Sequence, residues 1–165
     1  MRHPLLFEAN ARHWVSGLRA RYGGSIHLGN IPEEEIAPFQ KLGFTHIWLM
    51  GVWPTGELSR AQAVEHRDLR EAYEEALPGW KEEDILGSPY AVEGLHVAPF
   101  LGGDKALAIF RTRLARLGIR LILDFVPNHL GLDHSWLRSE PRRFVGSEWQ
   151  FSDSFLAETS LGKRF

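Results

Sequence analysis

The segment from residue 119 to residue 134 constrains the fold more than any other part of the chain. It reads Ile-Arg-Leu-Ile-Leu-Asp-Phe-Val-Pro-Asn-His-Leu-Gly-Leu-Asp-His. An apolar, β-prone run thus ends in Asp124, and Asn128 and His129 follow within five residues. Buried parallel strands have this pattern, because their faces are covered and their polar groups collect at the carboxyl end. We therefore expect an α/β protein with a functional sheet edge at Asp124.

The same helix–turn–strand unit occurs twice, 75 residues apart. Lys41-Leu42-Gly43 leads into an apolar strand expected at 45–52, and Arg116-Leu117-Gly118 leads into one expected at 119–126. A further strand is expected at 4–10. Repeated α–β units with apolar strands indicate a parallel sheet.

The helices and the C-terminal part are less regular in their pattern. Acidic residues open a helix at residue 33, and Pro38 is expected to shorten, kink or restart it. Residues 59–77 are typical of one helix. After residue 130 the chain is polar and irregular, so only a helix start at Asp133 and a surface position for His134 are predicted there.

Length and composition exclude several classes of function. The chain has 165 residues, a formal net charge of −2 and no cysteine. These values disfavour a nucleic-acid partner and exclude a disulfide or a thiolate metal site. No stretch approaches the roughly 18 apolar residues of a membrane span, and no signal peptide is recognised. A soluble, cytoplasmic protein without a membrane partner is therefore expected.

The polar residues after the third expected strand resemble a known signature. Asp124, Val126, Asn128 and His129 match the pattern Asp-x-Val-x-Asn-His, which is the first signature region of the α-amylase family (glycoside hydrolase family 13). Weaker similarity covers 7–14, 44–56 and 97–103. The resemblance implies the first three β/α units of a (β/α)₈ TIM barrel, truncated before the catalytic strands. Residues 1–129 would form the N-terminal part of the catalytic barrel, and 130–165 the start of the insertion after its third strand.

The resemblance also implies roles for individual residues. His129 and Tyr90 would bind the substrate, with Tyr90 stacking on a sugar, while Asp124 and Asn128 would support the site. Ala91 departs from the family, since many α-glucosidase-type members carry a sugar-binding Asp there. No cofactor is required and no metal ligand is predicted, except that calcium is possible in the complete protein, with Asn128 as a ligand. From the residues alone, a buried Asp124 needs a cation or several donors, typically an arginine.

The function implied is that of a fragment of an α-amylase-like glycoside hydrolase, which acts on α-glucosidic bonds by a retaining mechanism. Its partner would be an α-linked glucose oligosaccharide or polysaccharide. No catalytic carboxylate is assigned in this chain, which is therefore expected to be inactive alone. The alternatives are an α-glucan transglycosylase and a non-catalytic amylase-like binding protein. A weaker one is a metal-dependent hydrolase built on Asp124, His129 and His134.

The strand residues also lead to an expectation about solubility. A complete barrel needs at least about 200 residues, so an open sheet would leave strand faces and edges uncovered. We expect this surface to cause association of the isolated chain. The apolar residues expected to be exposed are Ile47, Leu49, Ile119, Leu121 and Leu123.

Overall fold

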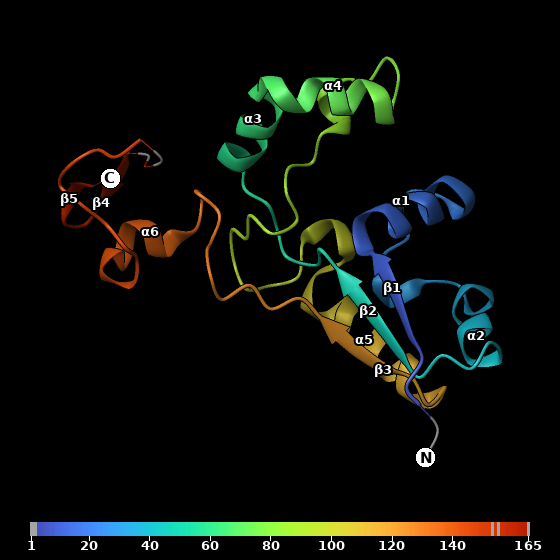
Figure 1. Ribbon diagram of the computed structural model, residues 1–165. Helices are drawn as coiled ribbons and strands as arrows, with labels where there is room; N and C mark the ends of the chain where they lie inside the picture. Colours follow the sequence, from blue (N-terminus) through green and yellow to red (C-terminus); the bar gives the residue numbers. More distant parts are fainter. Residues whose placement is uncertain (1–2, 153, 155, 165) are drawn as a thin grey trace. The chain divides into compact units, whose positions relative to one another are not determined.

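The computed structural model describes residues 3–152, 154 and 156–164 (Figure 1). Packing divides the chain into two units. The first is Met1–Pro54 with Leu95–Val126, and the second is Thr55–Gly94 with Pro127–Phe165. The predicted boundary at residue 129 concerned the barrel of a complete protein, and it stays a prediction.

The first unit contains a sheet of three parallel strands in the order β1-β2-β3. The strands are β1 (Leu6–Asn10), β2 (His46–Met50) and β3 (Arg120–Leu123). The helices of this unit are α1 (Ala11–Tyr22), η1 (Leu28–Asn30), α2 (Glu33–Lys41), η3 (Pro99–Leu101) and α5 (Gly103–Arg116). The predicted α/β class with a parallel sheet is confirmed, and the sheet is consistent with part of a (β/α)₈ barrel.

Local sequence signals explain where these helices begin. The Asn10 side chain accepts a hydrogen bond from the backbone N–H of His13 at 3.1 Å, which caps α1 at the end of β1. Gly102 precedes α5 with a φ of 91°, a left-handed conformation that favours glycine. Of the outcomes expected at Pro38, a restart is not seen: α2 runs through this residue to Lys41 as one short helix of nine residues.

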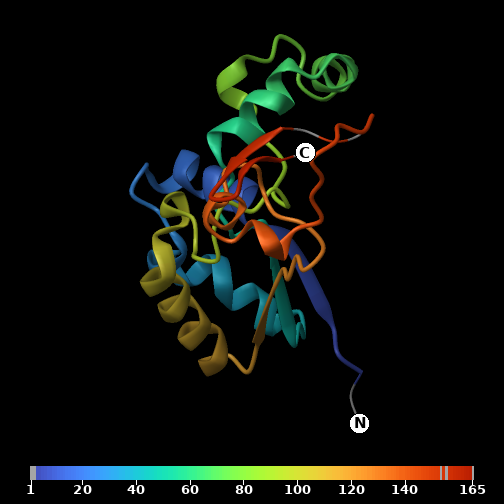
Figure 2. The ribbon, with the colours of Figure 1, turned by 90° about the vertical axis from the view of Figure 1, so that its left-hand side faces the viewer.

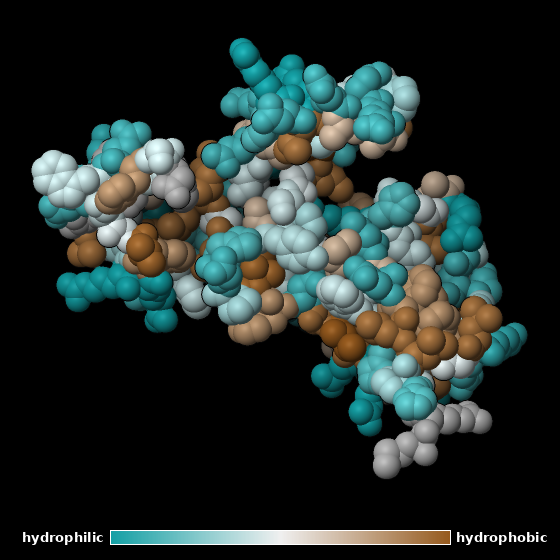
Figure 3. Space-filling view, viewed as in Figure 1, coloured by the Kyte–Doolittle hydropathy of each residue, from teal (hydrophilic) through white to brown (hydrophobic). Residues whose placement is uncertain are grey.

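The predicted exposure of the strand residues is wrong. Ile47, Leu49 and Ile119 are buried, and Leu121 and Leu123 pack against the same core. This core lies between the sheet and its helices, which Figure 2 shows on one side of the strands. Since side chains alternate along a strand, the other face carries a different set of residues. Leu6 and Ile122 are the exposed apolar residues on that face, and apolar side chains gather over the strands in Figure 3.

The second unit consists of short elements and loops. The stretch predicted as one helix forms α3 (Glu57–Glu65) and α4 (Arg67–Ala76), which are separated at His66, where ψ is 112°. η2 (Glu82–Asp84) follows. The C-terminal part contains α6 (Ser135–Ser139), η4 (Pro141–Arg143) and an antiparallel pair, β4 (Ala157–Thr159) and β5 (Gly162–Arg164), which the sequence pattern did not reveal. Within the described ranges, no helix is long and apolar enough to cross a membrane.

Candidate functional site

Asp124 is buried at the carboxyl end of β3, and neutral donors hold its carboxylate. Oδ1 accepts a hydrogen bond from the indole N–H of Trp48 at 2.8 Å, and Oδ2 accepts one from the backbone N–H of Gly51. Among the residues that the structure describes, no arginine pairs with it. Two hydrogen bonds from β2 and the residue after it therefore satisfy the burial requirement, instead of the typical cation.

The backbone beside Asp124 is also fixed by a tryptophan. The indole N–H of Trp53 donates to the Asp124 carbonyl at 3.1 Å, and the Arg12 guanidinium donates to the Trp53 carbonyl at 3.2 Å. Burial lowers the pKa of Arg12 from its ordinary value. Sequence reasoning missed both tryptophans, although their spacing around Gly51, in Trp-Leu-Met-Gly-Val-Trp, was a visible signal.

The segments that carry Tyr90 and His129 are joined by a hydrogen bond in the second unit. The backbone N–H of Gly131 donates to the Val92 carbonyl at 2.8 Å. Tyr90 lies two residues before Val92, and His129 lies two residues before Gly131. Both side chains are exposed. Asn128 lies beside His129, with Nδ2 3.3 Å from the ring Nδ1. That Tyr90 and His129 bind one sugar stays a prediction.

A third segment, residues 55–59, contacts both of these loops. We call the three contacting segments, residues 55–59, 88–92 and 131–134, the loop junction. Thr55 pairs with Val92 in an isolated antiparallel bridge, and its hydroxyl donates to the Ser88 carbonyl at 3.0 Å. The Asp133 carboxylate accepts hydrogen bonds from the backbone N–H groups of Leu58 and Ser59, each at 3.2 Å. The helix predicted to start at Asp133 begins one residue later, with His134 as its N-cap. Asp133 instead caps α3 from a distant part of the sequence.

His134 begins α6 in place of Asp133. Its Nδ1 accepts a hydrogen bond from the backbone N–H of Trp136 at 3.2 Å. The predicted surface position is wrong, because the residue is buried and its ring contacts that of Trp136. Burial lowers the pKa of His134 below its ordinary value, and the negative charge of Glu93 opposes this shift.

The predicted metal alternative can be compared with the placement of the possible ligand side chains in the described part of the chain. No group of three or more His, Cys, Asp or Glu side chains comes together there. The alternative of a metal-dependent hydrolase built on Asp124, His129 and His134 therefore gains no support. Calcium binding through Asn128 in a complete protein stays a prediction.

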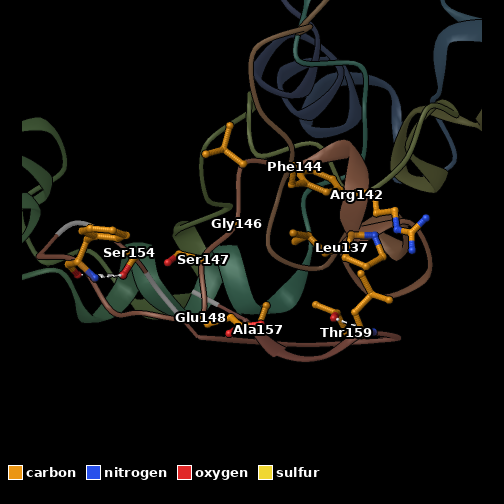
Figure 4. Close-up of a pocket in the computed structure, with 13 residues that line it drawn as sticks. Leu137, Arg142, Phe144, Gly146, Ser147, Glu148, Ser154, Ala157 and Thr159 are labelled. Atoms are coloured by element: carbon orange, nitrogen blue, oxygen red, sulfur yellow. Dashed lines mark hydrogen bonds between the residues drawn. The ribbon is translucent and has the colours of Figure 1, made fainter.

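An open cavity of about 830 Å³ lies in the C-terminal part of the second unit. Figure 4 shows Ser154 at one end and Leu137, Phe144 and Arg142 towards the other. None of the predicted site residues lines it. The cavity is therefore separate from the predicted sugar-binding residues.

The structure is similar to parts of three bacterial chains. No protein-family model and no curated protein sequence matches. An alpha-amylase from Lactobacillus plantarum aligns with a TM-score of 0.54 and 20% identity over 81% of this chain. A noncanonic maltogenic alpha-amylase, AmyB from Thermotoga neapolitana, aligns with a TM-score of 0.60 and 21% identity over 88%. Eubacterium rectale Amy13B aligns with a TM-score of 0.50 and 16% identity over 79%.

The similarity concerns a minor part of each larger chain. The alignments cover 25%, 28% and 19% of the three proteins, respectively. At these identities the comparison shows the fold, which is that of a piece of an alpha-amylase. The resemblance found in the sequence is thus confirmed at the level of the fold.

Proposed function

We propose that this chain is part of an α-amylase-like glycoside hydrolase that acts on α-linked glucose oligosaccharides or polysaccharides by a retaining mechanism. Two independent features support the proposal. The fold is similar to that of part of two alpha-amylases, and Asp124, Asn128 and His129 follow an apolar strand at the spacing of the family's first signature region.

The observation that carries the proposal is the hydrogen bond from Gly131 to Val92 at 2.8 Å. It joins two loops whose exposed side chains suit a sugar. An aromatic ring such as that of Tyr90 offers an apolar face, and the imidazole of His129 offers a donor and an acceptor for hydroxyl groups. Asn128 adds an amide beside His129, and Asp124 holds the end of β3 in place through its contacts with β2 and Gly51.

The reacting groups are proposed to lie elsewhere in the complete protein. A retaining reaction uses two carboxyl groups about 5–5.5 Å apart, one as nucleophile and one as acid and base. The carboxylate of Asp124 does not suit the nucleophile's role, since it is buried and both oxygens accept hydrogen bonds from the protein. The part described here is therefore proposed to bind and orient the sugar.

A titration followed by nuclear magnetic resonance tests this function. Maltoheptaose, which is α-linked, should shift the signals of the Tyr90 and His129 loops, while β-linked cellohexaose should not. Tyr90→Ala and His129→Ala should each weaken binding about tenfold or more, which corresponds to ~1.4 kcal/mol. Tyr22→Ala is the matched control, because Tyr22 is 40% exposed against 37% for Tyr90 and lies in the first unit. Equal binding of both glucans, or of all variants, would contradict the proposal.

A further inference from the structure

Three segments of the second unit contact one another in pairs at the loop junction. The Thr55–Val92 bridge joins the first two segments, and the Gly131–Val92 hydrogen bond of 2.8 Å joins the second to the third. The bonds from Leu58 and Ser59 to Asp133 join the third segment back to the first. Each segment is therefore held by the other two.

Asp133 makes the contact that closes this arrangement. Its two carboxylate oxygens accept from consecutive backbone N–H groups in the first turn of α3, where the helix dipole favours a negative charge. The side chain lies directly against the backbone of Gly56, because a Cβ at that position would overlap the Asp133 carboxyl group. With the Asp133 carboxylate in this place, there is no room for a side chain at residue 56.

The neighbouring Gly131 is equally constrained. A Cβ on Gly131 would lie 2.7 Å from the carbonyl oxygen of Ala91, which is closer than real Cβ atoms approach backbone. The stretch from Gly131 to Asp133 therefore touches both other segments within three residues. Tyr90 lies within the loop junction two residues before Val92, and His129 lies two residues before Gly131, so the positions of both depend on the hydrogen bond between Val92 and Gly131.

We propose that Asp133 is a positioning residue for the sugar subsite of Tyr90 and His129, an inference that rests on the proposed function. Asp133 does not touch the sugar. By holding residues 131–134 against the start of α3, it keeps the Gly131–Val92 hydrogen bond formed and fixes the separation of the two loops. Loss of the carboxylate leaves both side chains present but lets their loops move apart, so sugar affinity falls.

Amide hydrogen exchange of the whole chain tests the positioning itself. Asp133→Ala should raise the exchange rate of the Gly131 amide roughly 2- to 30-fold, as expected for the loss of a helix cap that also holds this contact. Asp133→Asn keeps one acceptor oxygen and should give a smaller increase. Gly56→Ala should act like Asp133→Ala, because its methyl group displaces the carboxylate while its φ of −76° is normal for alanine.

Asp84→Ala is the matched control. Asp84 also accepts a backbone hydrogen bond in the second unit, from Lys81 at 2.8 Å, but that contact spans only three residues. It should leave the Gly131 amide unchanged. The positioning role is overturned if the Gly131 amide exchanges at the same rate in the wild type and in both Asp133 variants. It is also overturned if Asp84→Ala raises this rate as much as Asp133→Ala does.

Maltoheptaose binding separates this inference from the proposed function. If the wild type binds, Asp133→Ala should weaken binding about tenfold and Asp84→Ala should not. Unchanged affinity in Asp133→Ala would overturn the inference and leave the function standing. If the wild type does not bind, the proposed function fails and with it the assignment of a sugar subsite. The exchange rate of Gly131 then still decides whether Asp133 holds the two loops together.

Discussion

The indole N–H of Trp48 donates to Oδ1 of Asp124 at 2.8 Å, across 76 positions of the sequence. The register of the sheet explains the contact, because Trp48 lies beside Ile122, two residues before Asp124, on the same face. The side chain of Trp48 therefore reaches diagonally from β2 to the residue that follows β3. This hydrogen bond ties the carboxyl end of β3 to the central strand.

Trp48→Phe should destabilise the first unit by about 1–3 kcal/mol. The substitution keeps an aromatic ring but removes one of the two donors to a buried carboxylate, and an unsatisfied buried group costs about this much. Urea unfolding followed by circular dichroism measures the change. Trp149→Phe is the control, since Trp149 is 77% exposed and its loss should cost less than about 0.5 kcal/mol. Equal effects of the two substitutions would show that the Asp124 contact contributes no stability.

His134 should make the second unit less stable in mild acid. Burial lowers the folded-state pKa of His134 below the ordinary value of 6.5, and Glu93 only partly opposes this. The unfolded chain therefore binds a proton at His134 more readily than the folded chain does. The contribution of neutral His134 to the free energy of unfolding is full above about pH 6.5 and is lost as the pH falls through the folded-state pKa. Melting temperatures between pH 8 and pH 5 measure this. His134→Asn keeps a good helix cap without a titrating group and should lose this dependence. An unchanged pH profile in that variant would contradict the assignment.

Gly102 and Gly103 should respond differently to alanine. Both have positive φ angles, 91° and 70°, which cost a non-glycine residue roughly 1–2 kcal/mol. A Cβ on Gly102 would also lie 2.6 Å from Cβ of Ala106 and 2.8 Å from Cγ of His27, whereas one on Gly103 meets nothing within 4 Å. Gly102→Ala should therefore lower the free energy of unfolding by about 1–3 kcal/mol more than Gly103→Ala. Chemical denaturation of both variants checks this, and equal losses would show that the space around Gly102 is not restrictive.

The sequence predicted the parallel sheet because its strands are short apolar runs bounded by glycine turns. It did not predict which face of each strand is buried. Ile47 and Leu49 alternate with Trp48 and Met50, so both faces of β2 are apolar and the pattern cannot distinguish them. Of the three outcomes that the sequence left open at Pro38, the structure excludes only a restart, because α2 continues past this residue and the Pro38 carbonyl accepts a hydrogen bond from the backbone N–H of Leu42 at 2.9 Å.

The candidate site was predictable as a set of residues but not as a set of contacts. Strand ends and a signature point to Asp124, Tyr90 and His129, whose roles in binding a sugar stay predictions. The roles of Trp48 and Asp133 depend on register and loop packing over more than 70 positions, which no local pattern encodes. The burial of His134 also depends on loop packing. It could not be predicted, because a histidine after an aspartate in a polar stretch carries no local sign of burial.

The isolated chain should show no glycosidase turnover. Retaining hydrolysis requires a carboxylate pair about 5–5.5 Å apart, and the acidic residue at the predicted site, Asp124, is engaged by Trp48 and Gly51. Release of nitrophenol from an aryl α-glucoside and of reducing ends from starch measures activity against a buffer control. Turnover by the pure 165-residue protein would contradict the assignment of a binding role to this part.

Self-association is expected through the open face of the parallel sheet. Leu6 and Ile122 are 47% and 40% exposed on this face, and β1 and β3 each have one unpaired edge in the described sheet. Apolar surface left in water costs roughly 25 cal/mol per Å², so a few hundred Å² would forfeit several kcal/mol. Unpaired edges add backbone groups that can bind another chain.

Sedimentation velocity measures this association. The wild type should contain dimers or larger species, and Leu6→Lys combined with Ile122→Lys should shift it to monomer by placing charges on the face. Leu42→Lys is the control, because Leu42 is 68% exposed but lies at the end of α2, outside the sheet. If the wild type is a monodisperse monomer, the three-stranded sheet is self-sufficient in water. If Leu42→Lys dissociates the chain as well as the double variant does, the contact lies elsewhere than on the sheet.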